Sequence, residues 1–439
     1  MIPANTINYD EKYDFLIITS SEFIEELIPL LDHKNQLGFS TKIIDINDIY
    51  QDTYFSVPGR DPPEKIKYFI KESIENWDTQ YIMFVGSKDK IPVRYVDLCY
   101  WDIHGECISD LYYADIYDEQ LEFCSWDSDN DGVFAGQSMD GMLDEIDFYP
   151  DVAFGRLLCE NKDELNIVID KIINYENNAN GKEWFNNIIL CGGDDARLRL
   201  RERFYKDWFN RPATIAWEGE LLCDTAGDIM SDFNAVKVYS TGLFKKDYMF
   251  LSSENINKAI NQGAGFIMFI GHGNYDNAIK TNFPMLKNLW LPYSQGYKTE
   301  YCKNLQNGDK LPIAIFGGCH CANFDLGDSP ISWEFVKNSN GGSIASFGGT
   351  TGTNMLGSSL VTEAFTAHLI LSIFRLYQQG ENILGDIWQK SLENYLDDEE
   401  AWKLGVEFSE LNWHHDLANY LVMEEWELLG DPTLKIGGY

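Results

Sequence analysis

Short apolar runs alternate with amphipathic segments over the first 90 residues of the chain. The runs YDFLIITS (13–20) and TQYIMFVGS (79–87) have the length and composition of buried strands. Between them, SEFIEELIPLLDHKNQLG and PPEKIKYFIKESIENW repeat apolar residues at helical spacing, and the first of these has a Ser cap and a closing Gly. This alternation predicts a parallel sheet covered on both faces by helices.

The alternation is interrupted between about residues 97 and 150 by a segment rich in aromatic and acidic residues. A long insertion of this kind in an α/β unit tends to be functional or stabilised by an ion. A helix over 161–178 and an Asn/Gly-rich linker near 177–181 follow it. We therefore expect an N-terminal α/β subdomain over residues 1–180 that carries this insertion.

A second alternating region begins at FNNIILCGGDD (185–195) and extends to the C-terminus. Its apolar runs include AVKVYS, AGFIMFIGHGN, LPIAIFGGCHC and GGSIASFGGTTGT, and helices are predicted near 197–209, 253–263 and 330–338. Four of its apolar runs end in polar, glycine-rich turns: GGDD, GHGN, GGCHC and GGTTGT. Parallel strands place such turns at one edge of a sheet, so residues 181–439 are expected to form a second α/β subdomain with a crevice there.

Two of these turns carry residues suited to nucleophilic catalysis. Cys319 ends one predicted strand, and His272 ends the predicted strand before it. Thiolate attack on a carbonyl needs a cysteine, a base and donors for the oxyanion, and the neighbouring glycines leave backbone N–H groups accessible. Alone, either residue is more often a loop histidine or a buried thiol, whereas the pair at consecutive strand ends favours catalysis.

The motifs around these residues resemble those of the gingipain-like cysteine peptidases, relatives of caspases, legumain and separase. The resemblance rests on an apolar run ending in GHG and on CHCANFD, which fits a C-x-x-[GA]-x-F-D pattern when Cys319 is its first residue. It extends to WELLGDPTLKI (426–436) and to much of the N-terminal half. The resemblance implies two stacked α/β subdomains with mainly parallel sheets covered by helices, the second of them caspase-like.

The same resemblance implies a role for each site residue. His272 is the general base and acid, Cys319 is the nucleophile, and the N–H groups of Gly273 and Cys319 form the oxyanion hole. An acid that orients the imidazole aligns best with Asp194, and Asp195 is the near alternative. One wall of the S1 pocket is expected from the glycine-rich segment 346–357, with Thr350, Thr351, Asn354 and Met355 as its residues. His320 is expected to be structural, because neighbouring strand residues point to opposite faces.

Substrate preference is less well defined by the sequence. The acidity of the chain leans toward peptides with Arg or Lys at P1, and Glu202 or Asp207 could supply the acid of the S1 pocket. The segment ARLRLRERFYKDWF is rich in arginine, so a pocket that prefers an acidic P1 residue remains open.

The segment DSDNDG (127–132) places Asp127, Asp129 and Asp131 at alternate positions before a glycine, a spacing that suits calcium. It departs from an EF-hand because Ser138 stands where the closing Glu belongs, so Asp140, Asp144 or Glu145 would have to close the site. We expect a structural calcium ion here and no organic cofactor. A bare acidic turn is the alternative.

The charge of the chain narrows the range of partners. Against 34 Lys and Arg stand 70 Asp and Glu, a formal net charge of −36 that repels nucleic acid and anionic membranes. Peptide or protein substrates fit this charge, and a monomer is favoured. The nine cysteines form no recognisable disulfide or zinc pattern.

The sequence also bears on localisation. No run reaches the roughly 18 apolar residues of a membrane helix, and the first residues lack a secretory signal pattern. The expected location is therefore the cytoplasm if Met1 is the native start, and secretion if an upstream segment has been removed.

These observations favour a cysteine endopeptidase. A catalytically silent, calcium-dependent binding protein on the same fold is one alternative, and a non-proteolytic thiol acyltransferase or amidase, which would use identical groups, is another.

Overall fold

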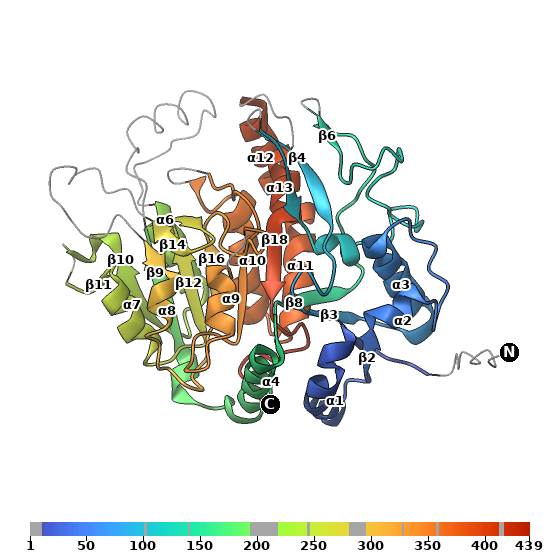
Figure 1. Cartoon of the computed structure of the whole chain (residues 1–439). Helices are drawn as coiled ribbons and strands as arrows, with labels where there is room; N and C mark the ends of the chain where they lie inside the picture. The colour runs from blue at the N-terminus through green and yellow to red at the C-terminus, as the bar shows by residue number, and fades with distance from the viewer. Residues whose placement is uncertain are drawn as a thin grey trace.

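The computed structural model describes residues 11–100, 103–138, 141–193, 218–243, 246–280, 296–326, 329–356, 360–411 and 417–439. Two helix-covered sheets, one of four strands and one of seven, pack side by side in these residues (Figure 1). The predicted α/β class with two mainly parallel sheets is confirmed. Within the described ranges, no helix is both long and apolar enough to cross a membrane.

The smaller sheet is formed by the N-terminal part of the chain and has the strand order β2-β1-β3-β8. Every neighbouring pair in it is parallel. One of its two inner strands, Phe15–Thr19, is buried at every position, because helices cover both faces. The strands are β1 (Phe15–Thr19), β2 (Thr41–Asp45), β3 (Tyr81–Val85) and β8 (Ala153–Leu157).

Local sequence signals explain several helix ends of this unit, but the predicted Ser cap is wrong, because the Ser21 hydroxyl donates to Asp45 and the first α-helix has Phe23 as its N-cap. Asp61 caps one helix by accepting from the Glu64 N–H, and two prolines follow it. Gly38 ends another helix in the left-handed region, at φ 104°. The helices are α1 (Ile24–Leu37), α2 (Ile46–Tyr50), α3 (Pro62–Trp77) and α4 (Lys162–Asn178).

The larger sheet has the strand order β11-β10-β9-β12-β16-β17-β18. Its strands are parallel except for the last, which runs antiparallel to its neighbour. The strands are β9 (Asn187–Gly192), β10 (Asn234–Tyr239), β11 (Met249–Phe250), β12 (Phe266–Ile270), β16 (Ile313–Gly317), β17 (Ala345–Gly349) and β18 (Trp426–Leu429). The carboxyl ends of six strands therefore share one edge.

Helices cover both faces of the larger sheet. The helices α6 (Glu218–Ile229) and α10 (Phe365–Gln378) pack on one face. The opposite face carries α7 (Ser253–Ile260), α8 (Thr299–Cys302) and α9 (Ile331–Val336). Along β12, Phe266 and Met268 belong to one apolar core, while Ile267 and Phe269 belong to the other, as the alternation of a strand requires. The helix predicted near 197–209 lies outside the described residues.

The C-terminal helices join the two units. They are α11 (Leu384–Asp397), α12 (Glu399–Leu411) and α13 (Leu417–Glu425). The first of them packs on β8 of the smaller sheet and on α10 of the larger unit. Edge strands β8 and β18 also pack together, and an ideal Cβ on Gly155 would lie only 2.5 Å from the carbonyl oxygen of Gly430.

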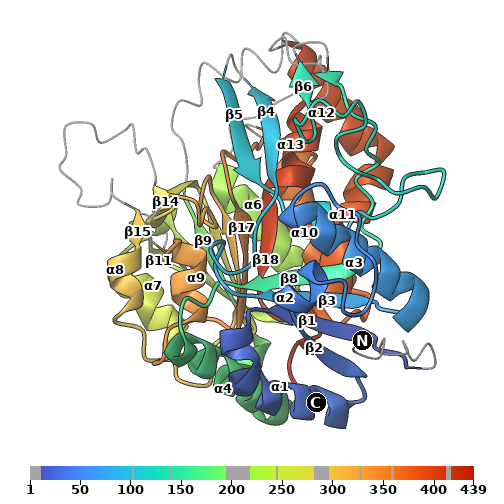
Figure 2. The ribbon, with the colours of Figure 1, turned by 45° about the vertical axis from the view of Figure 1, so that its right-hand side comes forward.

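The insertion forms antiparallel hairpins that rise beside the C-terminal helices (Figure 2). Strands β4 (Tyr95–Tyr100) and β5 (Ile103–Ile108) pair with each other and pack against α13. The shorter strands β6 (Gln137–Ser138) and β7 (Gly141–Met142) follow them. Short 3-10 helices lie at Ser21–Phe23, Leu111–Tyr113, Glu183–Asn186 and Ser240–Leu243.

Candidate active site

The segments that carry His272 and Cys319 leave adjacent strands at the same edge of the larger sheet. Strands β12 and β16 are parallel, and Ile270 pairs with Gly317 in their register. Each candidate residue stands two positions beyond this last pair. The predicted convergence of these two strand ends is thus present in the fold.

The two segments also touch each other beyond the strands. An ideal Cβ on Gly318 would lie 3.0 Å from the nitrogen of Gly273. One on Gly273 would lie 2.8 Å from the carbonyl oxygen of Cys319 and 2.6 Å from Cys321 Sγ. Side chains do not fit at such distances, so the glycines allow the histidine segment to lie directly on the cysteine turn.

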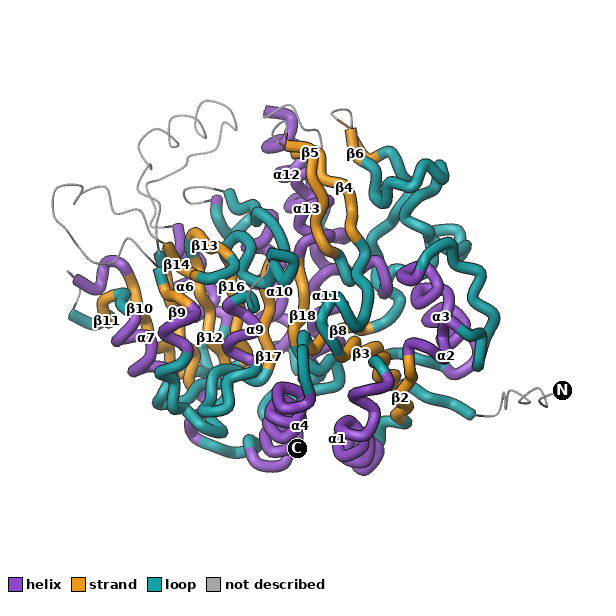
Figure 3. The backbone as a smooth tube through the Cα atoms, viewed as in Figure 1, coloured by secondary structure: helices purple, strands orange, loops and turns teal. Residues whose placement is uncertain are grey.

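His272 opens a small three-stranded sheet above this edge (Figure 3). Strand β13 (His272–Asn274) pairs with β14 (Asn277–Lys280), which pairs in turn with β15 (Tyr297–Lys298). The His272 side chain is exposed. The histidine is therefore the first residue of a hairpin that follows β12, at a position open to a substrate.

Cys319 is half-buried, and its sulfur contacts the loop that follows β17. Its Sγ lies 3.8 Å from the carbonyl oxygen of Thr353 and 3.7 Å from the Thr353 hydroxyl. Burial raises the pKa of the Cys319 thiol, the Thr353 side chain lowers it, and the charge of Glu425 raises it again. The sequence patterns indicated neither Thr353 nor Glu425 as a residue near the nucleophile.

The residues beside the nucleophile form a turn rather than the end of a strand. His320 has a left-handed backbone, at φ 58°, and its N–H donates to the carbonyl of Thr351 over 2.7 Å. Its ring Nδ1 lies 3.2 Å from the Asn323 side-chain nitrogen. We expected His320 to be structural because neighbouring residues of a strand point to opposite faces, but this segment is a turn and that reason does not apply. The His320 side chain does make a local contact. Cys321 is fully buried, and burial raises the pKa of its thiol.

The turn after the nucleophile reaches the N-terminal unit. Asp325 accepts from the Tyr95 hydroxyl over 2.8 Å and pairs with Lys88. The Arg156 guanidinium lies 5.8 Å from the centre of the Phe324 ring. The Phe-Asp end of the CHCANFD motif therefore holds the cysteine turn against the smaller sheet and its insertion.

Strand β9 brings a third segment to the same edge. It ends at Gly192, and the N–H of Gly193 donates to the carbonyl of Ile270 over 2.7 Å. Asp194 and Asp195, predicted to supply the acid, lie outside the described residues, as do Glu202 and Asp207. The last described residue before them is thus bonded to the strand that delivers His272.

The predicted S1 wall follows β17, beside Cys319. Thr350 is buried, and its hydroxyl lies 2.8 Å from the carbonyl oxygen of Ile108, so its side chain joins this wall to the insertion hairpin. Thr351, Asn354 and Met355 are half-buried. Their contact with substrate stays a prediction.

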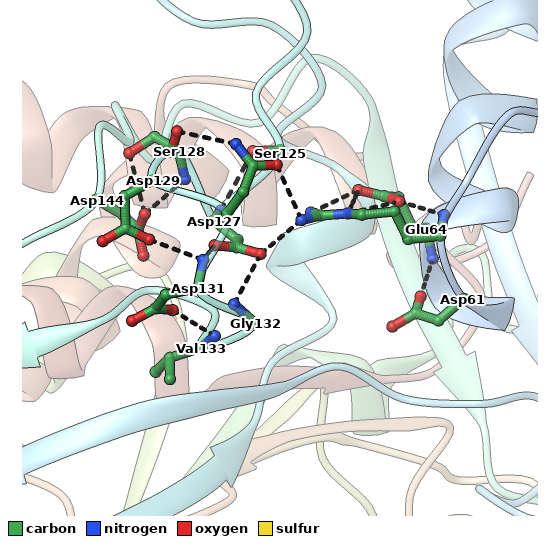
Figure 4. Close-up of polar contacts among 12 residues, drawn as sticks. Asp61, Glu64, Ser125, Asp127, Ser128, Asp129, Asp131, Gly132, Val133 and Asp144 are labelled. Carbon is green, nitrogen blue, oxygen red and sulfur yellow. Dashed lines mark hydrogen bonds and ion pairs between the residues drawn. The ribbon is translucent and has the colours of Figure 1, made fainter.

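The acidic loop of the insertion gathers the three predicted metal ligands (Figure 4). One carboxylate oxygen from each of Asp127, Asp129 and Asp131 lies within 4.8 Å of the other two. Asp127 is buried, and its oxygens accept from the N–H of Asp131 over 2.9 Å and from Arg60 over 2.6 Å. The cluster could hold a metal ion, and the Arg60 guanidinium competes for one of its oxygens.

Asp144, one of the proposed closing ligands, has another role in the structure. It accepts from the N–H of Ser128 over 2.6 Å and from the N–H of Gly136 over 2.7 Å, and so pins both ends of the acidic loop. Glu145 is exposed, and Asp140 lies outside the described residues.

Two stacked α/β units, with a cysteine turn and a histidine hairpin meeting at the carboxyl edge of the larger sheet, define a protein of the caspase-like fold class. The chain belongs to peptidase family C25, whose family model matches residues 8–437. The resemblance to gingipain-like proteins is therefore confirmed.

Individual relatives are distant in sequence. Gingipain R1 of Porphyromonas gingivalis is 21% identical over 329 residues, which cover 72% of this chain and 25% of that protein. An uncharacterised protein of Archaeoglobus fulgidus is 24% identical over 425 residues, covering 89% of this chain and 92% of that one. The chain thus spans about a quarter of the length of gingipain R1.

Solved structures support the fold. The crystal structure of the Arg-specific cysteine proteinase gingipain R superposes with a TM-score of 0.61 at 17% identity, covering 99% of this chain and 80% of that one. A complex of the pro- and mature domains of RgpB from Porphyromonas gingivalis gives 0.62 at 17% identity, covering 96% and 79%.

Proposed function

We propose that the protein is a cysteine endopeptidase that hydrolyses peptide bonds with Cys319 as nucleophile and His272 as general acid and base. The observation that carries this proposal is that His272 and Cys319 stand at equivalent positions beyond the paired strands β12 and β16. The turns that follow these strands also touch each other. Membership of peptidase family C25 supports the same chemistry.

In this mechanism the thiol proton of Cys319 passes to His272 as the sulfur attacks the scissile carbonyl carbon. The N–H groups of Gly273 and Cys319 stabilise the oxyanion, and His272 then protonates the leaving amine. Water hydrolyses the thioester and regenerates the thiol. Asp194 is proposed to orient the imidazole.

We further propose that the enzyme prefers Arg or Lys at P1, with Thr351, Asn354 and Met355 along the S1 wall. The net charge of −36 attracts basic peptides. Gingipain R, whose structure is similar, is an Arg-specific cysteine proteinase. For the acidic loop we propose a structural calcium ion held by Asp127, Asp129 and Asp131, because their oxygens converge and one of the three carboxylates is buried.

Active-site labelling tests the central proposal. Peptidyl acyloxymethyl ketones with Arg, Lys or Asp at P1 are expected to form an adduct with the wild-type protein and with Cys321→Ala, but not with Cys319→Ala. The Cys321 variant is a matched control, since it lies two residues away and is buried. Absence of a Cys319-dependent adduct with all three probes would contradict the peptidase and favour a silent binding protein.

A second measurement separates hydrolysis from acyl transfer. Incubation with a peptide library is expected to yield new peptide termini that depend on Cys319, with cleavage after basic residues. Labelling of Cys319 without cleavage of any peptide would instead point to a thiol acyltransferase or amidase.

A further inference from the structure

The sulfur of Cys319 lies against two polar groups of one residue, the carbonyl and the hydroxyl of Thr353. Its Sγ is 3.8 Å from the Thr353 carbonyl oxygen and 3.7 Å from the Thr353 hydroxyl oxygen. The two groups have opposite preferences, because a carbonyl only accepts a hydrogen bond whereas a hydroxyl can also donate one. The carbonyl suits a protonated thiol, and the hydroxyl can serve a thiolate.

The loop that carries Thr353 is held at both ends. At its start, the Thr350 N–H donates to the carbonyl of Glu425 over 2.7 Å. At its end, the carbonyl of Asn354 accepts from the N–H of Thr366 over 3.2 Å. Thr353 therefore does not depend on substrate for its place.

The loop is also tied directly to the cysteine turn. The N–H of His320 donates to the carbonyl of Thr351 over 2.7 Å, and that of Ala322 donates to the carbonyl of Gly349 over 2.9 Å. Both bonds come from residues that follow Cys319, one and three positions later along the chain. These backbone bonds hold the Thr353 loop against the cysteine turn, so the approach of the two residues does not depend on a single side-chain contact.

We propose that Thr353 is a positioning residue for the nucleophile, whose hydroxyl donates to the sulfur of Cys319 when the thiol proton has moved to His272. The inference rests on the proposed function and extends it to a residue outside the Cys, His and Asp set. In the resting protein the S–H donates to the Thr353 carbonyl. After proton transfer the hydroxyl donates to the sulfur alongside the backbone groups of Thr353 and Cys319, and its bond weakens as the sulfur bonds to the carbonyl carbon.

The surroundings of Cys319 disfavour the thiolate, and a hydrogen-bond donor to the sulfur counteracts them. Burial raises the pKa of the Cys319 thiol, and the Thr353 side chain lowers it. Glu425 is fully buried, and its charge, when the carboxyl is ionised, acts in the same direction as burial. A donor that favours the thiolate therefore opposes two effects that disfavour it.

The test compares Thr353→Val, which keeps the shape but loses the hydroxyl, with Thr353→Ser, which keeps the hydroxyl. Alkylation of Cys319 by iodoacetamide is measured against pH by peptide mass spectrometry in the full chain. We expect Thr353→Val to move the inflection to higher pH and to slow alkylation at pH 7 about tenfold, as loss of a hydrogen bond to a charged group predicts. Thr353→Ser is expected to restore the wild-type profile.

A control separates this effect from general loosening of the fold. Thr225→Val removes a hydroxyl that donates to the Leu221 carbonyl on α6, and it is expected to leave the alkylation profile unchanged. Should Thr353→Val unfold, judged by circular dichroism, Thr353→Ala carries the same expectation. A wild-type profile in the folded variant, or failure of serine to restore it, would overturn the inference.

The outcome is distinguishable from failure of the proposed function. Alkylation reports on the thiol whether or not the protein cleaves peptides, so a shifted profile without peptide cleavage would retain the contact and reject the peptidase. If the wild type cleaves peptides, kcat/KM of Thr353→Val is expected to fall at pH 7 and to recover at higher pH. A fall that persists at high pH would indicate a merely structural role.

Discussion

Lys34 on α1 lies 2.8 Å from Asp431, in the turn that follows β18, and both side chains are completely buried. The same ammonium group lies 2.8 Å from Glu176 at the end of α4. The Gly-Asp-Pro turn near the C-terminus therefore forms an ion pair with a lysine from the N-terminal part of the chain. Partner charges raise the pKa of Lys34 against the effect of burial.

Breaking this buried pair is expected to destabilise the protein strongly. Asp431→Asn leaves Lys34 with one fewer carboxylate and should reduce the free energy of unfolding by about 3 kcal/mol, since an uncompensated buried charge remains. Urea denaturation followed by circular dichroism measures the change. As a control, Lys162→Ala removes an exposed partner of Glu26 and should change the free energy of unfolding far less. Equal losses in the free energy of unfolding for the two substitutions would contradict a strongly stabilising role of the buried pair.

Gly273 is expected to tolerate no side chain. A Cβ there would lie 2.6 Å from Cys321 Sγ and 2.8 Å from the carbonyl oxygen of Cys319, so Gly273→Ala must push the histidine hairpin off the cysteine turn. Peptide hydrolysis should fall by about 100-fold, the scale expected for a small misplacement of reacting groups. Gly105→Ala, where a Cβ meets nothing within 4 Å, is the control and should retain activity. Comparable kcat/KM values for the two variants would contradict contact between the turns.

Stability is expected to fall as pH rises above the ordinary range of a glutamate. Burial raises the pKa of Glu424 and of Glu425 well above their usual value in the folded protein. The folded state therefore holds more protons than the unfolded state at intermediate pH. Stability from these groups is complete in mild acid and is lost with rising pH, by about 1.4 kcal/mol per pH unit and group.

Substitution tests this pH dependence. Glu424→Gln keeps an acceptor for the Gln137 side chain, which lies 3.1 Å away, and removes the charge. It should raise the melting temperature at pH 8 and leave it nearly unchanged at pH 5. The exposed Glu399→Gln on α12 should show no such difference. An unaltered pH dependence in Glu424→Gln would show that this carboxyl ionises normally in the fold.

Calcium is expected to stabilise the acidic loop. Millimolar Ca²⁺ should raise the melting temperature by about 2–5 °C, because a ligand that binds the folded state shifts unfolding by mass action. The shift should disappear in Asp129→Asn/Asp131→Asn, which removes two exposed carboxylates of the cluster. Mg²⁺ should act more weakly, since it holds its water more tightly. A Ca²⁺ response that survives the double substitution would place the ion elsewhere.

The sequence by itself determined the regular elements of both sheets. The runs 13–20 and 79–87 contain β1 and β3, and the run 311–321 contains β16. The closing Gly38 acts within one turn, so a local pattern predicted it, whereas the predicted Ser cap is absent because the Ser21 hydroxyl bonds to Asp45 instead. Alternation of strands and helices also implied that His272 and Cys319 leave neighbouring strands, because parallel strands end at one edge.

Only the tertiary structure decided what surrounds the nucleophile. Thr353 reaches the sulfur because the loop after β17 curves back over the cysteine turn, and no periodicity in the sequence encodes that curvature. Glu425 is the last residue of α13 and one of two adjacent glutamates, yet it is buried and its charge acts on a cysteine about a hundred positions earlier. Burial and contact between distant segments depend on how helices and sheets pack, and local sequence patterns carry no record of that packing.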